Sequence, residues 1–358
     1  MARQRSQIII RPSQRRQRSK LQREQAKQRA LFVAGAIAIL FIIAIPAYGY
    51  YANFVAPPRS VVLQVDDTKY TLGFLTKYLL GLEALGSQVS LSSEPFRLMQ
   101  QLQQDEIVRS GASRIGIAVS EEAIDQEVRD RIIGRSPELA EVPPDQLDRE
   151  FSEAYRQYLD TSNLSESEHR MFVEASLLRA ELREYLGTSL PESARQVNMS
   201  WIVISSRAEE GEDAALAAQE TVQEVALRLE RGEDFATVAE NFSDDRTTAV
   251  NGGEYGWLPE GTLGILDETI FALEIDQVSE AVSTGQFTYF FKVTDVEEDR
   301  ALEEDQLERL RNAELQNWIA QERGNHRITS CFGGGSAGGP CDWQYDWLVR
   351  KVTEATLE

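Results

Sequence analysis

Side chains that bind metals or act as nucleophiles are few in this chain of 358 residues. It contains two histidines, His169 and His326, and two cysteines, Cys331 and Cys341. These counts exclude zinc fingers, iron–sulfur clusters and multi-histidine metal centres. No serine or cysteine lies in a motif that pairs it with a histidine, so nucleophilic catalysis has no support. We expect no metal or cofactor, a solvated His169 on the first turn of a helix, and His326 at a helix end or in a loop.

The two cysteines have the spacing of a small closed loop. Five glycines and a proline lie between Cys331 and Cys341, so the chain can reverse and bring the two ends together. We predict a disulfide if this part of the chain lies outside the cytoplasm, with two free thiols or a metal site as alternatives. The bond would hold the aromatic tail at residues 343–347, which otherwise has little to keep it near the helix that carries Trp318.

Charge is distributed very unevenly along the chain. The total is −21, yet residues 1–30 carry ten Lys or Arg and a single acid, a net charge of +9. The remaining 328 residues therefore carry a net charge of −30. A body this acidic repels phosphate backbones, so we expect no nucleic-acid partner for it.

An uncharged apolar segment follows the basic residues. No charge occurs from Leu31 to Pro58, which exceeds the roughly 20 residues that a helix needs to cross a bilayer. We interpret residues 31–55 as a single-pass signal anchor in the cell membrane. The basic tail 1–30 then stays cytoplasmic, and the bulk of the chain is extracytoplasmic. A cleaved signal peptide and a buried core helix are the alternatives, and the tail could instead contact anionic lipid or RNA.

Helical periodicity dominates residues 58–192. After a short strand and turn near residues 61–67, apolar residues recur at helical spacing over 72–82 and 96–107. Ser120 and Ser165 are placed as N-caps of further helices, and another helix is expected over 145–160. This region contains no catalytic cluster, so its apolar stripes are most simply core.

The pattern changes to a mixed α/β order over residues 193–297. A strand is predicted at 197–204, helices at 213–231 and 234–242, a strand after Gly252-Gly253, a short helix ending at Leu273, and closing strands at 277–283 and 286–296. The order is β-α-α-β-α-β-β, which predicts a four-stranded antiparallel sheet with helices. The acidic run 297–308 is most simply a solvated helix start, and it opens the C-terminal segment 298–358.

This order of elements and the short sequence motifs within it resemble the parvulin family of peptidyl-prolyl cis-trans isomerases. The matching segments are VNMSWIVI, RGEDFATVAENFSDD, NGGEYGWLPEGTL, FAL, QVSEAV and FFKVTD, in that order over about 100 residues. The preceding helical region is similar to the chaperone part of exported foldases of the SurA, PrsA and PpiD kind. The anchored arrangement is most similar to PpiD-like proteins.

The resemblance implies a site without covalent chemistry. Parvulins lower the barrier of about 18–20 kcal/mol to X–Pro rotation by gripping the proline in an apolar pocket. Carried over by position, Asp245 occupies the family's Cys/Asp place, and Trp201 and Tyr289 occupy its two histidine places. The substrate-binding floor would be Tyr255, Leu263 and Leu266, or Ile265 in place of the last. We expect Tyr289 and Asp245 to carry any catalysis. Alternatively, Trp201 and Tyr289 only pack the sheet, and Asp245 only caps a turn.

Three functions remain open at this point. The chain is expected to be an α+β, membrane-anchored extracytoplasmic isomerase and chaperone that acts on unfolded or newly exported polypeptides. Replacement of both histidines leaves two alternatives: a weak or inactive parvulin-fold chaperone, or an accessory subunit of a larger membrane complex. The lipid bilayer is the other expected partner.

Overall fold

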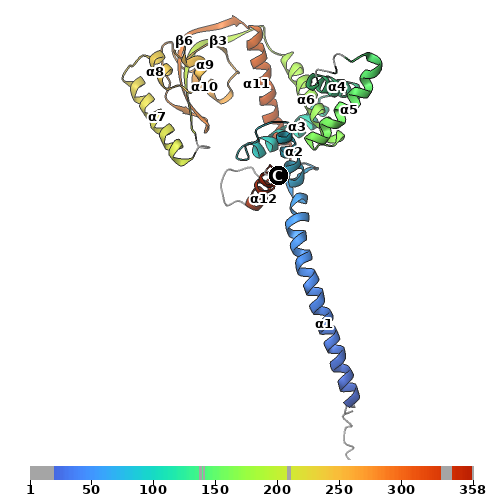
Figure 1. Cartoon of the computed structure of the whole chain (residues 1–358). Coiled ribbons are helices and arrows are strands. Elements are labelled where there is room, and N and C mark those ends of the chain that lie inside the picture. The colour runs from blue at the N-terminus through green and yellow to red at the C-terminus, as the bar shows by residue number, and fades with distance from the viewer. Residues whose placement is uncertain (1–19, 137–138, 140–141, 208–210, 332–340, 357–358) are drawn as a thin grey trace, which may run out of the picture. The chain divides into compact units, whose positions relative to one another are not determined.

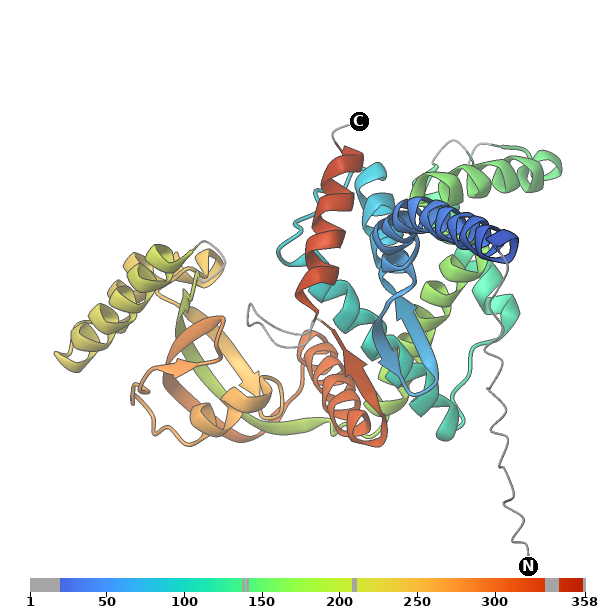
Figure 2. The same cartoon turned by 90° about the horizontal axis from the view of Figure 1, so that it is seen from below.

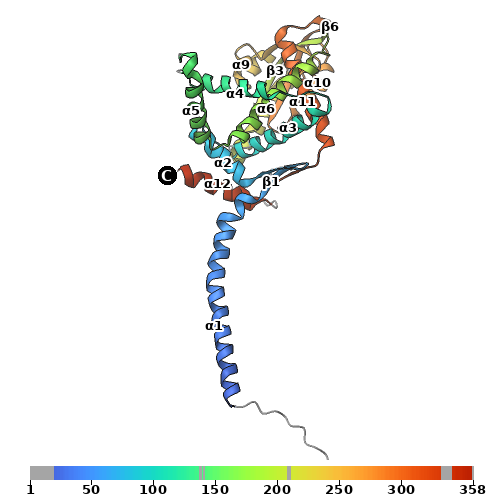
Figure 3. The ribbon, with the colours of Figure 1, turned by 90° about the vertical axis from the view of Figure 1, so that its right-hand side faces the viewer.

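The computed structural model describes residues 20–136, 139, 142–207, 211–331 and 341–356. Residues 1–60 and 61–358 are two compact units, and each is described by itself. The first unit holds helix α1 (Lys20–Tyr50), drawn in blue in Figure 3, and a short π-helical turn. A span from Lys27 to Val55 has a mean hydropathy of 2.7, and none of its most apolar window is buried. By length and composition, this helix can cross a membrane.

Five helices form the first part of the second unit. They are α2 (Leu72–Ala84), α3 (Glu94–Arg114), α4 (Glu121–Arg135), α5 (Pro144–Ser162) and α6 (Glu166–Gly187). The expected caps are present, because Ser120 accepts a hydrogen bond from the N–H of Ala123 and Ser165 forms a full capping box. Helix α6 packs against α3, α4 and α11 (Glu304–Glu322), as Figure 3 shows.

His169 is buried rather than solvated, which corrects the expectation from sequence. Only 5% of the residue is exposed. Tyr155 and Tyr158 of α5 lie over the imidazole, with ring centroids 5.4 and 5.0 Å away, and the Tyr155 hydroxyl lies 3.0 Å from Nδ1. The polar sequence around His169 does not reveal this, because the covering rings come from another helix.

A three-stranded antiparallel sheet joins the two ends of this unit. Its order is β2 (Thr68–Thr71), β1 (Val61–Val65) and β7 (Ile328–Ser330), visible side by side in Figure 2. Cys331 follows β7 and is bonded to Cys341, whereas the segment between them lies outside the described residues. Helix α12 (Asp342–Thr356) then packs on α2. Trp347 is buried in the same core as β1. Both the disulfide and apolar packing therefore hold the aromatic tail, whereas the sequence suggested little besides the disulfide.

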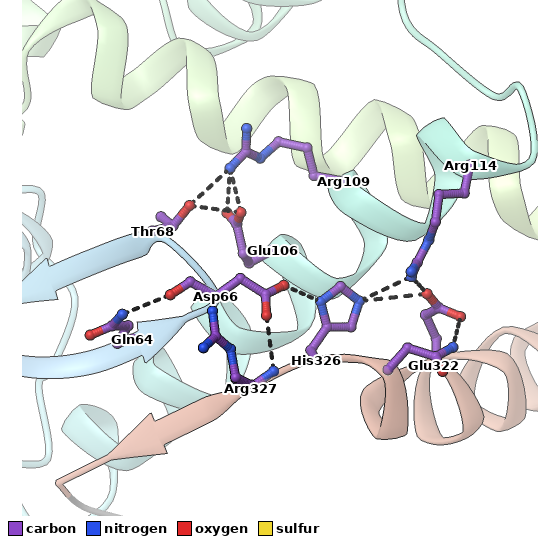
Figure 4. Close-up of polar contacts among 10 residues, drawn as sticks. Gln64, Asp66, Thr68, Glu106, Arg109, Arg114, Glu322, His326 and Arg327 are labelled. Atoms are coloured by element: carbon purple, nitrogen blue, oxygen red, sulfur yellow. Dashed lines mark hydrogen bonds and ion pairs between the residues drawn. The ribbon is translucent and has the colours of Figure 1, made fainter.

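Polar contacts reinforce this closure of the chain (Figure 4). His326 follows a short 3-10 helix at the end of α11, where a helix-end position was expected, yet only 1% of its side chain is exposed. Its Nδ1 lies 2.6 Å from Oδ2 of Asp66, in the β1–β2 turn. The N–H of Arg327 donates to the other oxygen of the same carboxylate at 2.9 Å. The Asp66 carboxylate therefore joins the turn to the chain after α11.

The second sheet has four antiparallel strands, as expected. Its order is β4 (Glu254–Pro259), β3 (Ser193–Ser205), β6 (Phe287–Ala301) and β5 (Val282–Ser283). Its helices, shown with β3 and β6 in Figure 1, are α7 (Glu212–Glu230), α8 (Phe235–Phe242), α9 (Arg246–Ala249) and α10 (Asp267–Phe271). The first closing strand is shorter than expected, with one isolated bridge from Val278 to Lys292 before it. The expected α+β class is confirmed.

The acidic run at 297–308 is not simply a helix start. Strand β6 continues through residues 297–301, where it pairs with residues 193–196 of β3, and α11 begins only at Glu304. Glu303 is the N-cap of α11, in a capping box with Gln306. The first acids of the run therefore belong to a strand, and the expectation of a helix start holds only for the second half of the run.

Candidate functional site

The two faces of the second sheet carry different apolar clusters. Alternate residues of β3 point to opposite faces. Ile202 and Ile204 lie in a core with α7 and α8, whereas Val197 and Met199 lie in a second core with α10. Trp201 packs on this second core, so its indole lies on the face away from α7 and α8. All five candidate apolar residues belong to this second cluster: Trp201, Tyr255, Leu263, Leu266 and Tyr289.

Trp201 is bonded directly to Asp245. The indole Nε1–H donates to Oδ2 of Asp245 at 2.8 Å and to the Thr248 hydroxyl at 3.0 Å. That hydroxyl in turn donates to the same carboxylate oxygen at 2.6 Å. The three groups form a closed polar triangle at the edge of an apolar surface.

Asp245 also caps a helix. It is the N-cap of α9, and its Oδ1 accepts a hydrogen bond from the N–H of Thr247 at 3.2 Å. Partial burial alone would raise the pKa of the Asp245 carboxyl, but the donors around it together hold that pKa below its usual value. The group is therefore ionised at neutral pH, and both of its oxygens are already hydrogen-bonded.

Three aromatic rings meet at the Trp201 position. The Tyr255 ring meets the indole edge-on at a centroid distance of 4.5 Å, and the Tyr289 ring is tilted at 6.0 Å. Tyr289 is paired with Val203 across β3 and β6, and it stacks on Phe291 at 5.8 Å. Burial raises the pKa of the Tyr289 hydroxyl, which therefore stays protonated and able to donate at neutral pH.

The loop after β4 completes the cluster. Leu266 is 6% exposed and packs in the core, whereas the neighbouring Ile265 is 78% exposed. Of the two alternatives from sequence, only Leu266 therefore reaches the cluster. Leu263 packs against it and is half-buried.

Two neighbours of the site were missed from the sequence. Thr248 bonds to both Trp201 and Asp245, and its place three residues after an N-cap is the available signal. Phe291 lies under Tyr289, and the period of two along β6 could have placed it on the same face.

The arrangement can bind apolar groups without a metal. Among the described residues, no group of three or more His, Cys, Asp or Glu is placed to hold a metal ion. Aromatic faces beside one fixed carboxylate suit a proline ring or an extended apolar segment.

Comparisons with known proteins agree with this geometry. The family model of the PPIC-type PPIase domain matches residues 183–297. The chain is 27% identical over 218 residues to a foldase protein PrsA of Geobacillus kaustophilus, an alignment that covers 56% of this chain and 69% of that protein. It is 40% identical over 88 residues to a periplasmic chaperone PpiD of Haemophilus ducreyi, covering 24% of this chain but only 14% of that protein.

A crystal structure of PrsA from Bacillus anthracis covers 73% of this chain, at 16% identity and a TM-score of 0.35, with 97% of its own chain aligned. Residues 183–297 match a PPIC-type PPIase domain, and the chain is similar to parvulin-type foldases of the PrsA and PpiD kind.

Proposed function

We propose that this chain is a membrane-anchored foldase that holds unfolded polypeptides and isomerises prolyl bonds far more slowly than a parvulin with two histidines. The observation that carries the proposal is the hydrogen bond from Trp201 to Asp245. It uses the indole N–H and one carboxylate oxygen before any substrate arrives. The related PrsA and PpiD proteins bear the names foldase and chaperone, which supports polypeptides as the substrate.

The expected loss of turnover follows from how isomerisation is accelerated. A parvulin must bind the twisted amide more tightly than the planar one. Here the carboxylate is already satisfied by Trp201, Thr248 and the α9 backbone, so it has little capacity left for a group that appears only in the transition state. The aromatic faces bind planar and twisted forms alike, which gives affinity without rate.

An uncoupled prolyl-peptide assay tests this proposal on the purified full chain. We expect a rate one to three orders of magnitude below that of a two-histidine parvulin, because each lost interaction of about 1.4 kcal/mol costs tenfold. In a second assay, the Trp201→Ala variant of the full chain should suppress the aggregation of an unfolded client protein less well than the natural chain does. Trp257→Phe is the control, since Trp257 lies elsewhere on β4 against Arg300. Turnover at the full family rate would overturn the assignment of Trp201 and Tyr289.

The proposed topology has the N-terminus in the cytoplasm and the bulk of the chain outside. It is supported by the ten basic residues before the apolar span and by the exposed surface of that span. Protease added to right-side-out membranes should digest residues 60–358 and leave a short N-terminal fragment. Full protection of residues 60–358 would show that the orientation is the reverse of the one proposed.

A further inference from the structure

A cavity in the helical region, away from the aromatic site, has an unusual lining. Its volume is about 520 Å³, and the helices α2 to α6 and α11 contribute to its wall. Asp105 is the one acid among its described lining residues, whereas four arginines line it: Arg131, Arg135, Arg179 and Arg183. In a body with a net charge of −30, four guanidinium groups around one cavity mark an exception.

The arginines come in two pairs, each one helical turn apart. Arg131 and Arg135 lie on α4, and Arg179 and Arg183 lie on α6, which packs against α4. Arg131 links the two helices through a 2.8 Å hydrogen bond to Ser176. Residues four apart share a face of a helix, so both pairs can point to one space.

Carboxylates of the chain itself use only part of this capacity. Arg131 pairs with Glu127 at 2.7 Å and Arg179 with Asp105 at 2.7 Å. Arg183 reaches Glu184 at 3.1 Å and Glu308 at 3.4 Å. The Nε atoms of Arg179 and Arg183 are nevertheless buried without a hydrogen-bond partner. Arg135 lies over the ring of Tyr158 at 5.2 Å, and no described carboxylate is within ion-pair distance of it. Donors therefore remain for an added anionic group.

The rest of the lining suits a peptide better than a bare anion. Aromatic rings from Tyr78, Tyr158 and Phe172 provide apolar contact, and the side-chain amides of Gln101 and Asn312 can pair with backbone groups. A second cavity of about 320 Å³ shares Tyr78, Leu82 and Gln101 with the first. The volume of the first cavity alone is in the range of ordinary ligand sites.

We propose that this cavity binds a carboxylate of a client polypeptide together with a neighbouring aromatic or aliphatic side chain. The carboxylate lies between the arginines of α4 and α6, whose planar forks match it bidentately. The apolar side chain packs on the rings of the α2, α5 and α6 wall. The choice of a polypeptide as ligand rests on the proposed foldase function, whereas the preference for a carboxylate rests on the arginines alone.

Peptide binding to the detergent-solubilised full chain tests the proposal. Four labelled decapeptides share one phenylalanine: one is neutral and amidated, one has a free C-terminal carboxylate, one is amidated with an aspartate beside the phenylalanine, and one is amidated with a lysine there. Fluorescence polarisation should show roughly tenfold tighter binding of one or both carboxylate peptides than of the neutral one. The second and third peptides distinguish a terminal from a side-chain carboxylate.

Charge-matched variants locate the effect in the cavity. Arg135→Gln should remove most of the carboxylate preference, because it takes away the guanidinium with no described carboxylate partner. Arg135→Lys should restore it in part. Arg149→Gln removes the same charge from an exposed position on α5 outside the lining and should change nothing.

Several results would overturn the inference. Equal affinity for the neutral and carboxylate peptides would do so, as would an Arg135→Gln effect no larger than that of Arg149→Gln. Displacement by a short-chain anionic phospholipid at lower concentration than by unlabelled peptide would assign the cavity to lipid. If these results came with intact binding of the neutral peptide, the foldase proposal would survive. Absence of binding to every peptide would overturn both.

Discussion

His169 should make the protein sensitive to mild acid. Burial, and to a lesser extent the nearby Arg131 and Arg135, lower the pKa of its imidazole from 6.5 to about 4. The ring is therefore neutral in the folded protein at pH 5, whereas in the unfolded chain most of it is protonated. Because the unfolded state binds more protons between pH 4 and 6.5, stability must fall as the pH drops through that range.

The size of the effect follows from the two pKa values. The full difference corresponds to roughly 3 kcal/mol, and about 2 kcal/mol of it is already lost at pH 5. Asp105 acts in the opposite direction, because burial raises the pKa of its carboxyl from 3.8 to about 6. The folded state then binds the extra proton, and stability gains about 1 kcal/mol between pH 7.5 and pH 5. The two groups partly cancel in the natural protein.

The substitution His169→Gln separates the two contributions. Glutamine cannot be charged, and it can still form a hydrogen bond with Tyr155. Between pH 7.5 and pH 5 the free energy of unfolding should change by about 2 kcal/mol more favourably in the variant than in the natural protein, because the variant lacks the loss caused by His169. Asp105→Asn should shift the same comparison the other way.

Urea unfolding of the full chain, followed by circular dichroism at 222 nm at both pH values, measures these differences. The comparison uses the change with pH in each protein, so a constant packing cost of the substitution drops out. Parallel pH dependence in the natural protein and in His169→Gln would refute the reasoning, because it would mean that His169 titrates alike in the folded and unfolded states.

Two further predictions concern the packing of the second unit. Gly81→Ala should lower the free energy of unfolding by more than about 2 kcal/mol, since a Cβ there would lie 1.9 Å from the carbonyl oxygen of Ser162 on α5. Gly134→Ala on α4 is the control, because its Cβ meets nothing within 4 Å and the change should be neutral or stabilising. Equal effects of the two substitutions in thermal unfolding would contradict the close approach at Gly81. Reduction of the Cys331–Cys341 disulfide should lower the free energy of unfolding by up to about 3 kcal/mol, because it releases a short loop. Mass spectrometry after alkylation should find no free thiol in freshly extracted membranes. Two alkylated thiols there would argue against an extracytoplasmic location.

Local signals in the sequence were enough for most of the elements. Ser120 and Ser165 start helices because a serine hydroxyl satisfies a free N–H of the first turn, which depends only on residues within one turn. The alternation over residues 197–204 likewise predicted a strand, where β3 lies, since a period of two needs no knowledge of partners. The family positions Trp201, Asp245 and Tyr289 follow from short motifs of the same local kind.

Contacts between distant segments could be decided only by the tertiary structure. His169 is buried by rings from another helix, and β6 extends through an acidic run because the start of β3 offers hydrogen-bond partners. The bond between Trp201 and Asp245 closes 44 residues of chain, and the arginine cavity gathers side chains from several helices. Sequence patterns report on neighbours along the chain, whereas burial and pairing depend on which surfaces meet, and that is set by the packing of the whole unit.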